Sequence, residues 1–157
     1  KIKKSISLFQ GVKRRFSILA KKKNNLVIDD YAHHPSEIKA TLESLRLISK
    51  KKIIAIIEPH RFSRLYSMLS DFTDSLKTSD SVFILPIYSA GEKNIKKIDS
   101  SLLYKHLKKK FNNKSISLVK NEKKFFEDLQ KSISPGDNII FWVQVRVRQL
   151  LRNFVII

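Results

Sequence analysis

The sequence predicts an α/β domain with a doubly wound, mostly parallel sheet and an N-terminal hairpin. Continuous apolar runs such as 52–57 are typical of parallel strands that are covered on both faces. These runs alternate with amphipathic patterns of helical length, as in βαβ units. A chain of 157 residues with 42% hydrophobic residues is long enough for one core and requires no second one.

The first elements are a hairpin and a helix. Two apolar stretches, 15–20 and 26–30, flank the polar reversal Lys-Lys-Lys-Asn-Asn, which suits an antiparallel hairpin. A helix is then predicted to start at Ser36, whose hydroxyl follows Pro35 and is the expected N-cap. Its apolar residues recur at helical spacing: Ile38, Leu42, Leu45 and Ile48.

Strands and helices then alternate to residue 141. After the strand 52–57, one helix is predicted from its apolar stripe of Leu65, Met68, Leu69, Phe72 and Leu76. The remaining predicted elements are a strand at 81–87, a helix at 100–110, a short strand at 115–119, a helix at 122–132 and, after a Pro-Gly-Asp turn, a strand at 138–141.

The net charge of +18 by itself indicates a nucleic acid or an anionic membrane as partner. The lysines, however, fall in short runs such as 21–23, 50–52 and 108–110, without the interleaved aromatic residues that stack on bases. We therefore interpret them as a solvated surface and expect no nucleic-acid partner. A basic nucleic-acid-binding module is the alternative function.

Composition also bears on the compartment. The chain has no cysteine, which excludes disulfides and thiolate metal sites and fits a reducing cytoplasm. No apolar run approaches the roughly 20 residues of a membrane span, and a secretory signal is missing. A cytoplasmic protein without a membrane partner is expected.

Polar residues gather where three of the predicted strands end, at 29–34, 58–64 and 88–92. The carboxyl ends of parallel strands lie along one edge of a sheet, where α/β proteins bind their ligands. Taken singly, each of these residues has an ordinary structural role: Asp30 as an acid in a turn, His34 as a loop histidine and Arg64 as a charge on a helix surface. Three such clusters at successive strand ends instead predict one cleft.

A metal centre is one use of two aspartates and two histidines within six residues, at 29–34. Adjacent side chains of an extended strand point to opposite faces, so each pair supplies about one ligand. We therefore expect no metal site. A small metal-dependent hydrolase is the third alternative.

An anion site is the favoured interpretation. Arg61 and Arg64 lie at helical spacing near a predicted helix start, with His60 beside them. Guanidinium groups bind carboxylates and phosphates in bidentate geometry, and a helix start favours negative charge. The chain has no Gly-x-x-x-x-Gly-Lys-Ser/Thr loop, so it does not bind a nucleoside triphosphate in that manner by itself.

Four segments resemble the UDP-N-acetylmuramate:L-alanine ligase family, a branch of the Mur ligases. Asp29-Asp30-Tyr31-Ala32-His33-His34-Pro35 is similar to its Asp-Asp-Tyr-Gly/Ala-His-His-Pro signature, and the two-histidine form favours the alanine-adding branch. The other three, in matching order, are Phe9-Gln10-Gly11-Val12-Lys13-Arg14-Arg15-Phe16, Pro59-His60-Arg61-Phe62-Ser63-Arg64 and Tyr88-Ser89-Ala90-Gly91-Glu92.

The resemblance implies an ATP-dependent ligase of peptidoglycan synthesis, and so a role in cell-wall biogenesis, cell shape and division. In that reaction ATP phosphorylates the carboxylate of UDP-N-acetylmuramate, and the amino group of L-alanine attacks the acyl phosphate. In this family ATP and Mg are bound mainly by the central domain, which also holds the catalytic residues. An N-terminal domain binds UDP. Both are missing partners here, so a fragment that is inactive alone is expected, with no catalytic residue of its own.

The resemblance also assigns roles by motif position. Arg15 is expected to contact an ATP phosphate, and Asp30 the ribose hydroxyls. The carboxylate of L-alanine is expected at His33, Arg61 and Arg64, with Tyr31 close by. Further, weaker candidates for the site are His34, His60, Tyr88 and Glu92.

Three segments of the chain are predicted. Residues 1–14 are the junction from the missing central domain, 15–141 form the C-terminal α/β domain, and 142–157 are an aberrant tail. Where the family continues with Gly-Ala-Gly, this chain reads Trp-Val-Gln-Val. If one nucleotide is restored before the codon of Trp142, the shifted reading frame must encode the first glycine of the family ending and can encode the residues that follow it. We therefore interpret the tail as frameshifted. A genuine basic amphipathic helix is the alternative.

Overall fold

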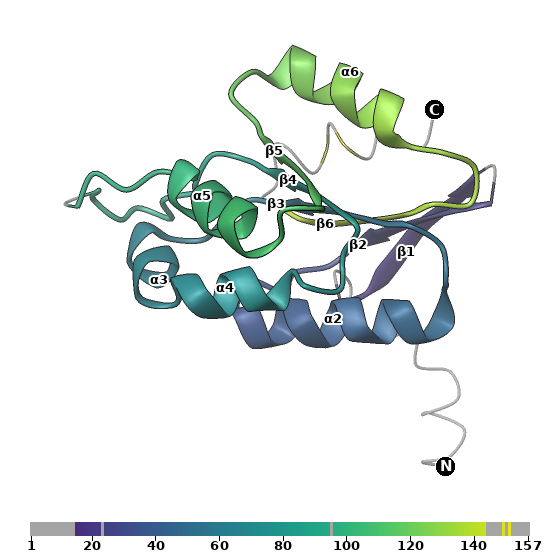
Figure 1. The fold of residues 1–157 in the computed structure, drawn as a ribbon, viewed down its shortest axis with the longest axis horizontal. Coiled ribbons are helices and arrows are strands. Elements are labelled where there is room, and N and C mark those ends of the chain that lie inside the picture. Colours follow the sequence, from purple (N-terminus) through teal and green to yellow (C-terminus); the bar gives the residue numbers. More distant parts are fainter. Residues whose placement is uncertain (1–14, 23, 95, 144–148, 150, 152–157) are drawn as a thin grey trace, which may run out of the picture.

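The computed structural model describes residues 15–22, 24–94, 96–143, 149 and 151. The junction motif before Arg15 and most of the tail after 143 therefore lie outside the described residues. A six-stranded sheet in the order β1-β2-β6-β3-β4-β5 forms the centre of the molecule (Figure 1). The strands are β1 (Ser17–Lys22), β2 (Asn25–Asp29), β3 (Ile53–Ile57), β4 (Ser81–Ile84), β5 (Ser115–Leu118) and β6 (Asn138–Trp142).

The predicted fold class is confirmed. β1 and β2 form the antiparallel hairpin, and every other neighbouring pair in the sheet is parallel. Helix α6 (Glu122–Ser132) lies on one side of the sheet (Figure 1). The other side is covered by α2 (Pro35–Ile48), α3 (Phe62–Ser67), α4 (Leu69–Ser75) and α5 (Ser101–Lys110).

The central strand β3 shows how the two layers share the core. Its five residues are all buried, as the unbroken apolar run predicts. Ile53, Ala55 and Ile57 belong to the core under α2 to α5, whereas Ile54 and Ile56 pack with α6. This alternation follows from the two-residue repeat of a strand. Among the described residues, no helix is long and apolar enough to cross a membrane.

The start of α2 differs from the prediction. The N-cap is His34, whose Nδ1 accepts the N–H of Ser36 at 3.4 Å, so the prediction of a Ser36 cap is wrong. Glu37 completes a capping box, because its Oε2 accepts the N–H of His34 at 3.2 Å. Pro35 already lies in the first turn, where a missing N–H costs nothing.

The helix predicted across 65–76 is in fact two. α3 begins earlier, at Phe62, and the chain leaves helical geometry at Met68, with φ −120° and ψ 30°, before α4 begins. Leu65 of α3 and Phe72 of α4 are both buried, so the break lets each short helix bury its own apolar face. The sequence periodicity continues through the break and therefore hides it.

Two strand ends also differ from the prediction. β4 ends at Ile84 and not at Ile87. The N–H of Leu85 still donates to Ile57 O at 2.8 Å, but Pro86 has no N–H to continue the ladder directly after it. β6 continues one residue further than predicted, to Trp142, which pairs with Ile57 and is buried.

Two leucines on α2 provide a test of this core. Leu42 is fully buried and Leu47 is 82% exposed. Leu42→Ala is expected to lower the free energy of unfolding by about 2 to 5 kcal/mol, because it leaves a cavity between α2 and the sheet. Leu47→Ala is expected to change it by less than about 0.5 kcal/mol. Urea denaturation measures both, and equal losses would show that α2 packs on another face.

Candidate functional site

A row of four aromatic rings joins the three predicted polar clusters. The ring centroids of Tyr31 and His33 lie 5.5 Å apart, and those of His33 and His60 lie 6.0 Å apart with nearly parallel planes. The row continues to Tyr88, 5.1 Å from His60. A parallel β-bridge between His60 and Tyr88 fixes the backbones that carry these rings. The carboxyl ends of β2, β3 and β4 thus meet, as predicted.

Arg64 connects two of these clusters. Its Nη1 donates to the carbonyl oxygen of His60 at 3.2 Å and lies 3.5 Å from that of His33. One guanidinium nitrogen therefore holds the histidine segments together. Arg61, the N-cap residue of α3, is exposed beside them. The two guanidinium groups predicted to bind an anion therefore come from the N-cap and the first turn of one short helix.

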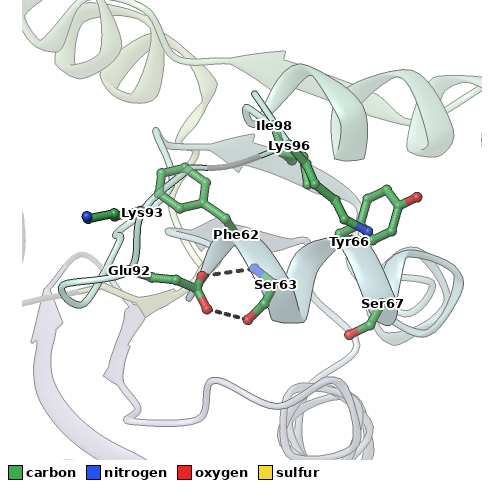
Figure 2. Close-up of a pocket in the computed structure, with 8 residues that line it drawn as sticks. All are labelled: Phe62, Ser63, Tyr66, Ser67, Glu92, Lys93, Lys96 and Ile98. Atoms are coloured by element: carbon green, nitrogen blue, oxygen red, sulfur yellow. Dashed lines mark hydrogen bonds between the residues drawn. The ribbon is translucent and has the colours of Figure 1, made fainter.

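The start of α3 is held by a residue from the next cluster. Within the described part of the chain, the side chain of Arg61 makes no capping bond to α3. Instead, the carboxylate of Glu92 accepts the N–H of Ser63 at 2.9 Å and its hydroxyl at 2.5 Å (Figure 2). These two bonds from Ser63, helped by the positive charge of Arg61, lower the pKa of Glu92 below its usual value. Glu92 therefore acts as an N-cap supplied from outside the helix.

Asp30 is placed inside the protein. Its Oδ2 accepts the N–H of Phe16 at 2.7 Å, and its Oδ1 accepts the N–H of Ala32, also at 2.7 Å. The indole Nε1 of Trp142 donates to the same Oδ1 at 3.2 Å. With 4% of its surface exposed, Asp30 ties together the ends of the hairpin and β6.

Arg15 lies at the start of α2, where it pairs with Glu37. Its Nη1 is 3.2 Å from Glu37 Oε1, and both side chains are partly exposed. Glu37 Oε2 also accepts the N–H of His33 at 3.1 Å. Burial alone would raise the pKa of Glu37, but the bonds from His33, Arg15 and His34 bring it below the usual value. Glu37 thus links Arg15 to the histidine segment.

Sequence reasoning missed three residues that shape this site: Glu37, Ser63 and Trp142. A signal existed for Glu37, which follows His34 at the spacing of a capping box. Ser63 and Trp142 act on partners 29 and 112 residues away in the sequence, and such pairings carry no local signal. His34, a weaker candidate, serves the helix start through its bonds to Ser36.

The arrangement is suited to binding a small anion. Arg61 and Arg64 supply cationic donors, and the rings of Tyr31, His33, His60 and Tyr88 stand beside them. Glu92, whose carboxylate lies near enough to Arg61 to feel its charge, is engaged by Ser63. Among the described residues, no three His, Asp or Glu side chains are grouped to hold a metal ion.

The clamp between Glu92 and Ser63 predicts a pH-dependent signal. A carboxyl group with a lowered pKa stabilises the fold at pH values above its ordinary pKa of about 4.3. This stabilisation is lost as the pH falls through the pKa of the folded state. The NMR signal of the Ser63 amide should therefore titrate with a midpoint below that ordinary value.

Two variants check the assignment. Glu92→Gln should abolish the titration of the Ser63 amide, whereas Glu127→Gln, an exposed change on α6, should leave it intact. A Ser63 amide that still titrates in Glu92→Gln would show that another group holds the start of α3.

Comparisons with known proteins identify relatives of this chain. The sequence profile of the family described as "Mur ligase, glutamate ligase domain" matches residues 14–142. The UDP-N-acetylmuramate--L-alanine ligase of Rickettsia bellii is 42% identical over 88% of this chain. The corresponding ligase of Allorhizobium ampelinum is 46% identical over 68% of the chain.

A solved structure shows the same fold. The crystal structure of the UDP-N-acetylmuramate-alanine ligase of Thermotoga maritima matches 97% of this chain with a TM-score of 0.72 and 27% identity. The match covers 31% of that structure and 30% of the Rickettsia bellii ligase, so the chain spans about a third of the length of these relatives. The chain therefore belongs to the Mur ligase family, in which it matches the glutamate ligase domain.

Proposed function

We propose that this chain is the C-terminal part of an ATP-dependent ligase that adds L-alanine to UDP-N-acetylmuramate through an acyl phosphate. The relatives at 42% and 46% identity carry that name and support the proposal. As part of such an enzyme, the chain acts in cytoplasmic peptidoglycan synthesis. It is inactive alone, because ATP and Mg are bound mainly by the central domain and the UDP group by the N-terminal domain.

The single observation that carries the proposal is the convergence of His33, Arg61 and Arg64 at the joined strand ends. In this proposal the carboxylate of L-alanine lies between the two guanidinium groups, with His33 and Tyr31 beside it. A fixed guanidinium orients its ligand, and orientation of an attacking amine lowers the barrier of a bimolecular step. The contact of Arg64 with the carbonyl oxygen of His60 supports such a fixed position.

Arg15 is the proposed contact for an ATP phosphate. Its partner in the chain is Glu37, and the Arg15 side chain is 53% exposed. Exposed ion pairs of this kind contribute about 0.2 to 1 kcal/mol. Arg15 can therefore leave Glu37 and pair with a phosphate at little cost in free energy. A phosphate is also the more highly charged partner.

Asp30 is the proposed ribose contact, and its carboxylate is buried in this structure. Its Oδ1 already accepts two hydrogen bonds, from Ala32 and Trp142, whereas Oδ2 accepts one, from Phe16. A carboxylate oxygen has two lone pairs, so Oδ2 has room for a ribose hydroxyl. Because Asp30 is buried, this contact requires the cover over its carboxylate to open.

The arginine assignment can be tested in a chimaera in which residues 15–142 replace the matching segment of the Rickettsia bellii ligase. Arg61→Ala and Arg64→Ala should each raise the KM for L-alanine at least roughly tenfold, because losing a bond to a charged group costs about 1.5 to 3 kcal/mol. The KM for ATP should change little. Steady-state phosphate release measures both constants.

Arg15→Ala serves as the matched control in the same chimaera. It removes a guanidinium from the proposed phosphate contact and should raise the KM for ATP while leaving that for L-alanine unchanged. If Arg61→Ala or Arg64→Ala instead weakened ATP use and kept normal alanine dependence, the proposed division of the cleft would be wrong.

A further inference from the structure

A cavity lies beside α3 in addition to the strand-end site. Its volume is about 410 Å³, within the usual range for small-molecule sites. One wall is α3 itself, and the other is the segment that follows Tyr88 (Figure 2). The lining residues are Phe62, Ser63, Tyr66, Ser67, Glu92, Lys93, Lys96 and Ile98.

The surface of this cavity is mainly apolar and partly aromatic. Phe62 is half-buried, and Ile98 has only 8% of its surface exposed. Tyr66 is 51% exposed, and the ammonium group of Lys96 lies over one face of its ring, which leaves the other face for a ligand. Exposed ring faces of this kind pack well against another planar ring. The aromatic lining of the cavity therefore favours an aromatic group.

The charge beside these rings is positive. Lys96 Nζ lies 3.7 Å from the centre of the Tyr66 ring, and Figure 2 shows Lys96 against Tyr66 with Lys93 on the far side of Phe62. Within the described ranges, neither lysine lies within ion-pair distance of a carboxylate. The one acid in the lining, Glu92, directs both oxygens at Ser63. A cation without an anionic partner thus stands over an aromatic surface.

We propose that this cavity binds a small aromatic carboxylate, with its ring against Phe62 and Tyr66 and its carboxylate on the ammonium group of Lys96. An apolar cavity with few polar groups is the usual form of such sites, where the polar groups fix the orientation. The cavity shares Ser63 and Glu92 with the strand-end site but is lined by neither Arg61 nor Arg64, and the proposal does not depend on the proposed function. A neutral ring would leave Lys96 without an anion, and an aliphatic acid would leave the ring faces uncovered.

NMR titration of the isotope-labelled chain with indole-3-acetate tests the proposal. Saturable shifts are expected at the amides of Tyr66, Lys96 and Ile98. Indole-3-acetamide has the same ring without the charge, and acetate has the charge without the ring. Both should bind more weakly than indole-3-acetate. Equal binding of the amide, or no saturable shift with indole-3-acetate, would overturn the proposal.

Two substitutions locate the ligand. Lys96→Gln should weaken binding about 1.4- to fivefold, the range that an exposed ion pair provides. Lys123→Gln, an exposed change on α6, is the matched control and should have no effect. Ser67→Trp places a large side chain in the cavity and should abolish binding. Lys96 is exposed, so its substitution is not expected to affect folding, and unchanged affinity in Lys96→Gln would contradict the proposed contact.

Discussion

The burial of parallel strands on both faces is the constraint on which the rest of this structure depends. β3 and β6 are buried along their whole length, and they pair in parallel from Ile53 with Asn138 to Ile57 with Trp142. Parallel strands need crossover helices, and those helices supply the two covering layers. The same direction of the strands brings all their carboxyl ends to one edge. The position of the candidate site is therefore set by the parallel strands of the core.

A few polar contacts hold the segments at the joined strand ends in place. Arg64 bonds to the backbone of His60, Glu92 bonds to the start of α3, and Glu37 bonds to the backbone before α2. Each contact joins segments that follow different strands or begin a helix. Charge-assisted hydrogen bonds are among the stronger polar contacts in proteins, so they suit the positioning of exposed loops. The cationic helix α3 is thereby fixed between the histidines and Glu92.

Most of the fold could be predicted from the sequence, because its signals are local. The unbroken run at 53–57 and the helical repeat at 122–132 correspond to β3 and α6. The break at Met68 could not be predicted, because the apolar repeat continues through it from α3 into α4. The early end of β4 had a signal, Pro86, that the apolar run concealed.

The candidate site shows the same division. Convergence of the strand ends follows from parallel topology and was predicted, as was the placement of Arg61 and Arg64 at a helix start. The engagement of Asp30 by Phe16 and Trp142 was not, because it joins residues far apart in the sequence. The same reason applies to Glu92, which sequence reasoning placed in the cleft without its bond to Ser63.

The central claim is that the joined strand ends form a carboxylate site for L-alanine. NMR titration of the labelled chain with L-alanine tests it most directly, read at the guanidinium groups of Arg61 and Arg64 and at the ring of His33. Saturable shifts at these groups, with a dissociation constant in the millimolar range or below, are predicted for L-alanine and not for L-alaninamide, which has no carboxylate. Equal binding of the amide, or saturable shifts confined to other residues, would contradict the account.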